Sequence, residues 1–289
     1  MEGYNSSYRA ESYELAHTRH PWLNKDAPVY WEAYKLMRQL RRLKQSNSCR
    51  YIVVDIGTGT GRVIRHLTDR LTQEASSPKE VLFLGLDPSP YMLEHAQRSI
   101  PNTFKQSTFY YPVSALEMHT IDFLKGPPIV DLLVFAKGYI SSLYMPGEVE
   151  EFLRLVSSVL RPHTGRVYLS LFHMSEEHNA EKASHTYREM TNSLITEEAL
   201  SVIYPGVVYR QTKSDVKMEG GFQVVTSSLQ VVERRRDGQE RVIEKDTAVV
   251  KCRIWKKGEF IRVADMAGLD FIEAKGTDDE TIYVFKTVG

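Results

Sequence analysis

The apolar positions of the chain fall into short runs, each followed by a turn and then by a helical stripe. Residues 51–56 form the clearest run, because they are mostly apolar and β-branched and lead into a glycine-rich turn at 57–61. Val63, Leu67 and Leu71 follow at a spacing of four residues, the spacing of one apolar helix face. This pattern predicts a buried parallel strand, a tight loop and the N-terminus of a helix.

Similar runs recur along the chain and alternate with helical patterns, as at residues 148–160. Further strands are expected at residues 81–86, 108–113, 129–136, 166–172, 271–274 and 281–286. Strands that alternate with helices predict an α/β fold. We therefore predict a Rossmann-like sheet of seven strands, parallel except for one antiparallel strand near its edge, with helices on both faces.

The N-terminal segment, residues 1–45, lies outside this alternation. It combines polar residues with aromatic rings and ends in a helical pattern that begins near Asp26, the expected N-cap. We interpret it as a lid followed by a helix, and a disordered tail is the alternative for its first part. The core is then expected at residues 46–175, with the last strands at 258–289 completing it.

We predict that a second segment, residues 176–257, is an insertion on the substrate side of the core. Residues 174–218 are polar and irregular, with a helix expected near 181–203. Two β-prone runs follow at 221–232 and 241–255, and Asp237-Gly238 between them is a strong hairpin signal. We expect a β-hairpin that is added to the core.

The composition argues against nucleic-acid-binding, disulfide-rich, membrane-spanning and metal-binding classes of protein. The 289 residues carry 37 lysines and arginines against 37 aspartates and glutamates, which argues against a broad nucleic-acid surface. Two cysteines, Cys49 and Cys252, give no disulfide framework, and no apolar run approaches the length of a membrane span. His17 and His20 lack further ligands at metal spacing. We expect a cytoplasmic protein, monomeric or homodimeric, without metal, membrane or nucleic-acid partners.

An acidic residue follows the second strand and completes the pattern of a nucleoside site. Asp87 lies 26 positions after Gly61, at the tip of the strand, where a carboxylate can accept hydrogen bonds from both hydroxyls of a ribose. The dinucleotide fingerprint G-x-G-x-x-G is not met, because Arg62 stands where its last glycine should be.

The run Asp55-x-Gly57-x-Gly59-x-Gly61 resembles the first motif of the class I S-adenosylmethionine (SAM)-dependent methyltransferases, roughly [DE]-x-G-x-G-x-G. The resemblance covers residues 50–172 well and 258–288 moderately, and the inserted hairpin resembles that of small-molecule, natural-product enzymes. It implies SAM as the cofactor and S-adenosylhomocysteine (SAH) as the product. It also implies that Asp55 supports the methionine end and that Asp87 binds the ribose. The remaining cofactor contacts implied by position are Gly57, Thr58, Gly59, Gly61, Pro88, Met92, Ser114, Ala115, Leu116 and Ala136.

Three residues are candidates for the acceptor side. Tyr13 lies in a Ser-Tyr-Glu-Leu-Ala segment that resembles the family's N-terminal Tyr-[DE]-x-x-Ala element. Tyr139 follows the fourth strand and His173 ends the fifth, at the edge where α/β sheets bind ligands. His173 is the candidate general base, since histidine exchanges a proton near neutral pH. The family's [DN]-P-P-[YF] motif for nucleobase or glutamine acceptors is absent after the fourth strand, which favours a small-molecule acceptor.

The sequence thus predicts a SAM-dependent methyltransferase that acts on N, O or S of a small molecule, in secondary metabolism. Three alternatives stay open at this point. They are a SAM-fold enzyme with other chemistry, such as a cyclase or isomerase, a non-catalytic regulatory subunit that keeps the fold, and an NAD-linked oxidoreductase.

Overall fold

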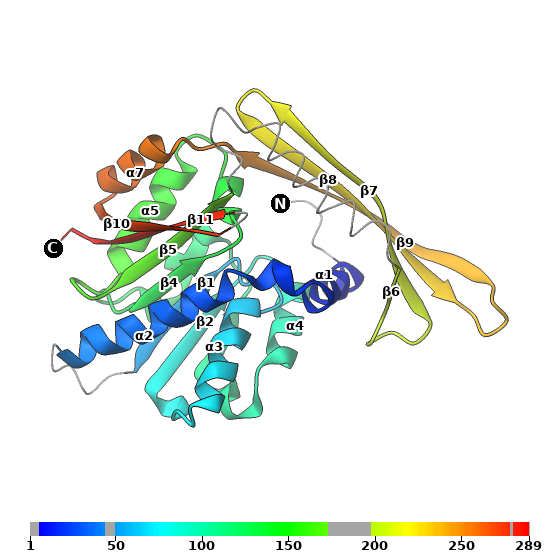
Figure 1. Cartoon of the computed structure of the whole chain (residues 1–289), viewed down its shortest axis with the longest axis horizontal. Coiled ribbons are helices and arrows are strands. Elements are labelled where there is room, and N and C mark those ends of the chain that lie inside the picture. Colours follow the sequence, from blue (N-terminus) through cyan, green and yellow to red (C-terminus); the bar gives the residue numbers. More distant parts are fainter. Residues whose placement is uncertain (1–5, 44–49, 173–197, 278–279, 289) are drawn as a thin grey trace.

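The apolar runs form one central sheet in the computed structural model, which describes residues 6–43, 50–172, 198–277 and 280–288 (Figure 1). Its seven strands lie in the order β10-β11-β5-β4-β1-β2-β3. Strands β1 to β5 pair in parallel, and β11 is antiparallel to both β5 and β10. This confirms the predicted sheet. The strands are β1 (Tyr51–Ile56), β2 (Val81–Leu86), β3 (Thr108–Tyr111), β4 (Leu132–Phe135), β5 (Arg166–Phe172), β10 (Leu269–Gly276) and β11 (Glu280–Thr287).

Helices cover both faces of the sheet because successive strand residues point to opposite sides. On β1, Ile52 and Val54 join the apolar cluster under α5 and α7, whereas Val53 joins the cluster under α2 and α3. The α-helices of the core are α2 (Ala27–Leu43), α3 (Arg62–Gln73), α4 (Pro90–Ser99), α5 (Glu148–Val159) and α7 (Lys257–Met266). Short 3₁₀ turns complete it: η1 (Pro21–Asn24), η2 (Pro78–Glu80), η3 (Asn102–Ser107), η4 (Ala115–Thr120), η5 (Asp122–Leu124) and η6 (Tyr139–Ser142).

The order of the strands locates the ligand crevice. β1 lies between β2 and β4, so the chain leaves β1 in one direction along the sheet and later returns on its other side. In open α/β sheets, ligands bind at the carboxyl ends of the strands beside such a switch point. The loops after β1, β2 and β4 therefore form the expected site.

A second sheet stands apart from the core and has four antiparallel strands in the order β6-β7-β8-β9. They are β6 (Ala199–Leu200), β7 (Val207–Glu219), β8 (Phe222–Arg234) and β9 (Glu240–Arg253). The expected hairpin is thus correct for β8 and β9, but residues 207–219 are a strand and not an irregular segment. Residues 210–215 of β7 are all polar, so no alternating apolar pattern marks this strand, and the structure pairs it with β8. Most of the helix expected near 181–203 lies outside the described residues, and part of its end is β6.

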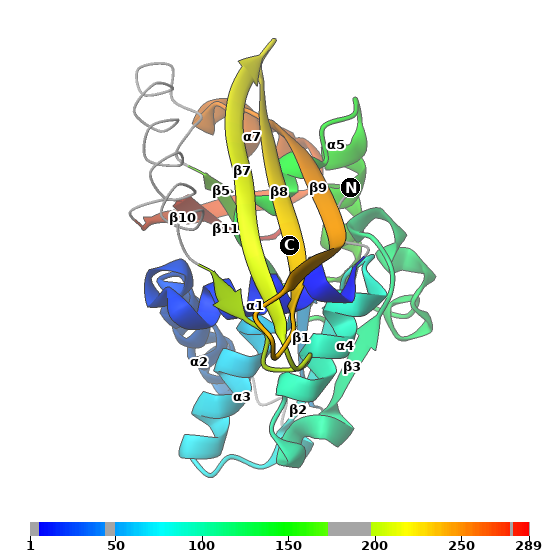
Figure 2. The same ribbon diagram turned by 90° about the vertical axis from the view of Figure 1, so that its right-hand side faces the viewer.

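Helix α1 (Ser7–Arg19) lies between the core and the antiparallel sheet, which Figure 2 shows face-on. The Glu11 carboxylate accepts hydrogen bonds from Ser201 Oγ at 2.7 Å and from the Tyr209 hydroxyl at 2.5 Å. Arg9 pairs with Asp246 of β9 at 2.6 Å. Hydrogen bonds and an ion pair therefore attach α1 to the antiparallel sheet. The disordered-tail alternative is wrong for residues 7–19, which form a helix. In the described ranges, no helix combines the length and the apolar composition needed to cross a membrane.

Candidate active site

The loop at residues 57–61, hereafter the glycine loop, connects β1 to α3 at the carboxyl edge of the sheet. All its glycines have φ between +55° and +82°, a region that favours glycine. A Cβ on Gly61 would lie 2.9 Å from the Cβ of Ala96, so glycine allows α3 and α4 to approach. At Gly59 only the Tyr13 ring comes within 4 Å of such an added atom, at 3.9 Å. On the side that faces α1, the Tyr13 ring is therefore the nearest group to the Gly59 backbone.

Asp55 lies beneath this loop, at the end of β1. Its Oδ2 accepts a hydrogen bond of 2.6 Å from the Thr58 hydroxyl. Burial raises the pKa of the Asp55 carboxyl to about 7, and the Thr58 hydrogen bond lowers it only in part. A buried carboxylate of this kind is stabilised when a positive charge binds beside it.

Asp87 follows β2 and contacts the glycine loop directly. Its Oδ2 accepts a hydrogen bond of 3.0 Å from the Gly59 amide, and its Oδ1 accepts one of 2.9 Å from the Ser89 amide. Burial raises the pKa of Asp87 to about 6. A carboxylate has about four acceptor positions, so Asp87 can hold the loop and still accept two ribose hydroxyls. The loop-holding contact was not predicted from the sequence.

Helix α1 covers the glycine loop through Glu14. The Glu14 carboxylate accepts a hydrogen bond of 2.6 Å from the Thr60 hydroxyl and forms an ion pair with Arg65 of α3. The neighbouring Tyr13 places its ring above Gly59. The sequence placed Glu14 at the acidic position of the Tyr-[DE]-x-x-Ala element but did not predict its partners, which lie 46 and 51 positions away.

A buried ion network forms one wall of the same edge. Asp26 receives two hydrogen bonds of 2.7 Å from Arg62, the first residue of α3, and lies 3.3 Å from the Lys137 ammonium. Lys137 also lies 3.4 Å from Glu280, the first residue of β11. Burial would raise the pKa of Asp26, but the charges of Arg62 and Lys137 lower it, whereas burial raises the pKa of Glu280. Asp26 stands before α2 as predicted, yet its carboxylate pairs with Arg62 and joins α2 to α3.

Comparison with known proteins identifies the family. The chain aligns over 290 residues with the N-methyltransferase FrzE from Cladobotryum sp, at 31% identity, and the alignment covers 99% of this chain and 96% of that relative. No protein-family model matches the chain. The chain belongs to the class I SAM-dependent methyltransferases.

Solved structures agree with the fold of this methyltransferase. A SAM-dependent methyltransferase from Clostridium acetobutylicum ATCC 824 superposes with a TM-score of 0.59 at 13% identity, covering 96% of this chain and 98% of that one. The sugar N-methyltransferase KedS8 from Streptoalloteichus sp ATCC 53650 superposes with a TM-score of 0.58 at 14% identity, covering 93% of this chain and 91% of that one. DesVI from Streptomyces venezuelae superposes with a TM-score of 0.58 at 17% identity, covering 96% of this chain and 98% of that one. At these identities the likeness concerns the fold alone.

The residues of the carboxyl edge fit the cofactor of the methyltransferase. The Tyr13 ring is the nearest group to Gly59, and Asp87 keeps acceptor positions for a ribose. Asp55 and Asp87 both have raised pKa values and favour a cationic ligand over a neutral one. When bound, SAM supplies a methyl group that is already activated on a positively charged sulfonium. The match to an N-methyltransferase over 99% of the chain removes the NAD-linked alternative.

The other sequence-predicted residues of the methyltransferase lie around this edge. Ser114, Ala115 and Leu116 begin η4 after β3, where the Ser114 amide donates to Glu117. Among the remaining residues, Pro88 is exposed, Met92 and Ala136 are buried, and Tyr139 begins η6. His173 lies outside the described residues, so its role as a base stays a prediction.

No group of three histidines, cysteines or acids that could hold a metal occurs in the described part of the methyltransferase. His17 Nδ1 lies 3.1 Å from the Asn24 side-chain oxygen. Burial, together with the charge of Arg62, lowers the pKa of His17 to about 3, so the ring is neutral at physiological pH.

Proposed function

We propose that this methyltransferase transfers the methyl group to a nitrogen of a small-molecule amine. The observation that carries the proposal is the match to the N-methyltransferase FrzE over 99% of the chain. The inserted antiparallel sheet between β5 and α7, which resembles that of natural-product enzymes, supports a place in secondary metabolism.

The proposed reaction mainly requires the protein to align the acceptor with the methyl group, because the methyl donor is activated before the acceptor binds. Asp87 and the glycine loop hold the nucleoside end, and Asp55 stabilises the positive charge of the methionine end. Helix α1, bound to the glycine loop through Glu14, covers the cofactor site and excludes water from it. An amine attacks through its lone pair, so it has to be neutral at that moment.

The acceptor side is proposed to be formed by Tyr13, Tyr139 and His173. The Tyr13 ring faces Gly59 of the glycine loop, and Tyr139 follows the loop after β4. His173 would accept the proton that the amine loses. Ser114, Ala115 and Leu116 remain proposed contacts of the adenine.

Methyl transfer from isotope-labelled SAM tests this proposal. Purified protein is incubated with matched acceptors that differ only in the reacting atom, namely an amine, a phenol and a thiol, and mass spectrometry locates the label. We expect SAH to form and the label to appear on nitrogen. The Asp87→Ala variant serves as the control that transfer depends on this cofactor site. Label on oxygen or sulfur alone would contradict N-methylation, and binding of SAM without label on any acceptor would favour the cyclase or regulatory alternatives.

A further inference from the structure

The strand order indicates in which direction the cofactor lies along the carboxyl edge. Asp87, the proposed ribose ligand, follows β2, and the proposed adenine contacts follow β3. Strands β1 and β4 lie on the other side of β2 from β3. Because adenine and methionine are attached at opposite ends of the ribose, the methionine end of SAM extends toward β1 and β4. Its α-ammonium and α-carboxylate groups are therefore expected among the residues that follow these two strands.

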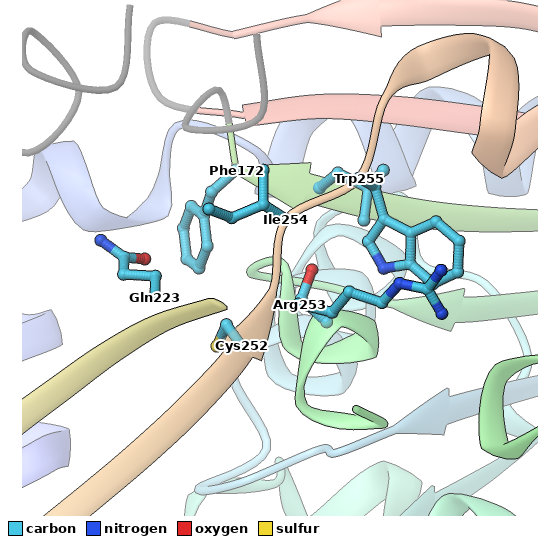
Figure 3. Close-up of a pocket in the computed structure, with 8 residues that line it drawn as sticks. Phe172, Gln223, Cys252, Arg253, Ile254 and Trp255 are labelled. Carbon is cyan, nitrogen blue, oxygen red and sulfur yellow. The ribbon is translucent and has the colours of Figure 1, made fainter. Parts of the chain in front are cut away.

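The pocket at the junction of the two sheets has no room for this end of the cofactor (Figure 3). It lies between β5 and β9, where Phe172, Cys252 and Ile254 line its walls. Its volume is about 10 Å³, which is enough for about one water molecule. Gly138 of the loop after β4 packs so closely here that an added Cβ would lie 2.4 Å from the Phe172 ring. The groups that can meet the methionine end therefore lie on the side of α1 and α3.

His17 is the residue of α1 that lies on this side. It follows Tyr13 by four residues, so both side chains share one face of the helix, and their ring centroids are 4.5 Å apart. The Tyr13 ring in turn lies beside Gly59. Burial lowers the pKa of His17 most, and the charges of Arg62 and Lys137 lower it further. The His17 ring is therefore close both to the glycine loop with the start of α3 and to the loop after β4.

Asn24 determines which nitrogen of His17 carries the proton. The Asn24 amide donates a hydrogen bond of 2.9 Å to the His17 carbonyl oxygen, and the Asn24 side-chain oxygen lies 3.1 Å from His17 Nδ1. An oxygen acceptor requires the proton on Nδ1, which leaves a lone pair on Nε2 of the neutral ring. The pKa of His17 is lowered by burial to about 3, so the ring cannot take a proton from an amine near neutral pH. Nε2 is a hydrogen-bond acceptor and not a base.

This acceptor is unpaired but can be reached by a ligand. In residues 6–43, 50–172, 198–277 and 280–288, the hydrogen bonds of the His17 ring are limited to that between Nδ1 and Asn24. Nε2 also differs from the unpaired Tyr30 hydroxyl and Glu280 Oε2, which are fully enclosed. A group that donates an N–H at this edge can therefore bind to Nε2.

We propose that His17 Nε2 accepts a hydrogen bond from the α-ammonium group at the methionine end of the cofactor. Asp55 supplies the negative charge for this end, and the neutral His17 ring adds an acceptor without adding a charge. The neighbouring cation of Arg62 does not prevent this, because it pairs with Asp26 through two hydrogen bonds of 2.7 Å. The inference rests on SAM as the cofactor and does not depend on which acceptor atom is methylated.

Calorimetry on the full-length protein with two ligands tests this contact. One ligand is SAH, and the other is an SAH analogue in which hydrogen replaces the α-ammonium group. His17→Asn keeps an amide near the Nδ1 position but loses the Nε2 acceptor, whereas His17→Gln places an amide oxygen near the Nε2 position. We expect His17→Asn to bind SAH about 10-fold or more weakly than the wild type, since the lost hydrogen bond involves a charged group. Both proteins should bind the analogue with equal affinity, and His17→Gln should recover part of the SAH affinity.

The analogue distinguishes a lost contact from damage to the fold. Equal weakening of both ligands in His17→Asn would show that the residue acts only through the packing of α1, and this would overturn the proposal. An unchanged SAH affinity in His17→Asn would overturn it as well. Equal losses of SAH affinity in His17→Asn and His17→Gln would also contradict the proposal, because only the glutamine variant keeps an acceptor near the Nε2 position.

Discussion

Replacing Asp55 by asparagine removes a buried charge and leaves the shape of the side chain. The asparagine oxygen can still accept the hydrogen bond that Thr58 donates at 2.6 Å. Burial raises the pKa of Asp55 from 3.8 to about 7 in the folded chain. Each unit of this difference corresponds to about 1.4 kcal/mol, so the ionised carboxylate lowers the stability of the ligand-free fold by up to about 4 kcal/mol.

The sign of the pH dependence follows from the raised pKa. Between its unfolded and folded pKa values, Asp55 binds a proton more readily in the folded chain, so its contribution to stability is lost as the pH rises through about 7. Ligand-free Asp55→Asn should therefore be more stable than the wild type at about pH 8. This advantage should shrink by about 2–3 kcal/mol at about pH 5.

Urea unfolding of both proteins at the two pH values measures this difference. Asp87, whose pKa is also raised, is present in both proteins, so the comparison isolates the contribution of the Asp55 charge together with its repulsion of Asp87. Calorimetry should also show weaker SAM binding in Asp55→Asn, because the variant lacks a negative charge for the cationic ligand. Parallel pH profiles of unfolding in the two proteins would refute the reasoning.

Two further substitutions test the geometry of the glycine loop. Asp87→Ala should lower SAM affinity by roughly 10- to 100-fold, since a hydrogen bond to a charged group contributes about 1.5–3 kcal/mol. Calorimetry on the folded variant measures this loss, and an unchanged affinity would contradict the ribose role of Asp87. Gly61→Ala should lower the free energy of unfolding by about 1–3 kcal/mol more than Gly147→Ala. Both glycines have φ above +80°, but an added Cβ meets Ala96 only at Gly61, so equal losses in urea unfolding would contradict the packing argument.

The sequence was sufficient for the parts of the molecule whose signals are local. The glycine loop and Asp87 each follow an apolar strand directly, and the strands of a parallel sheet bring their carboxyl ends to one edge. The sheet and the position of the cofactor motif were therefore predictable. Strand β7 was not, because residues 210–215 carry no apolar alternation and depend on pairing with β8.

Contacts between distant residues left no signal in the sequence. Lys137 and Glu280 lie 143 positions apart, and neither residue type is unusual in a solvated loop. Glu14 lay next to the predicted Tyr13, but its role required knowing that α1 covers the glycine loop.

The attachment of α1 has a consequence for chimeras built from this chain. Glu11 binds Ser201, 190 positions further along the chain, while Glu14 on the same helix binds the glycine loop. The first helix and the antiparallel sheet are thus held together as one structural unit, although β1 to β5 separate them along the chain. A chimera that imports the sheet from a relative has to import the matching first helix as well, or the imported strands lose their connection to the cofactor loop.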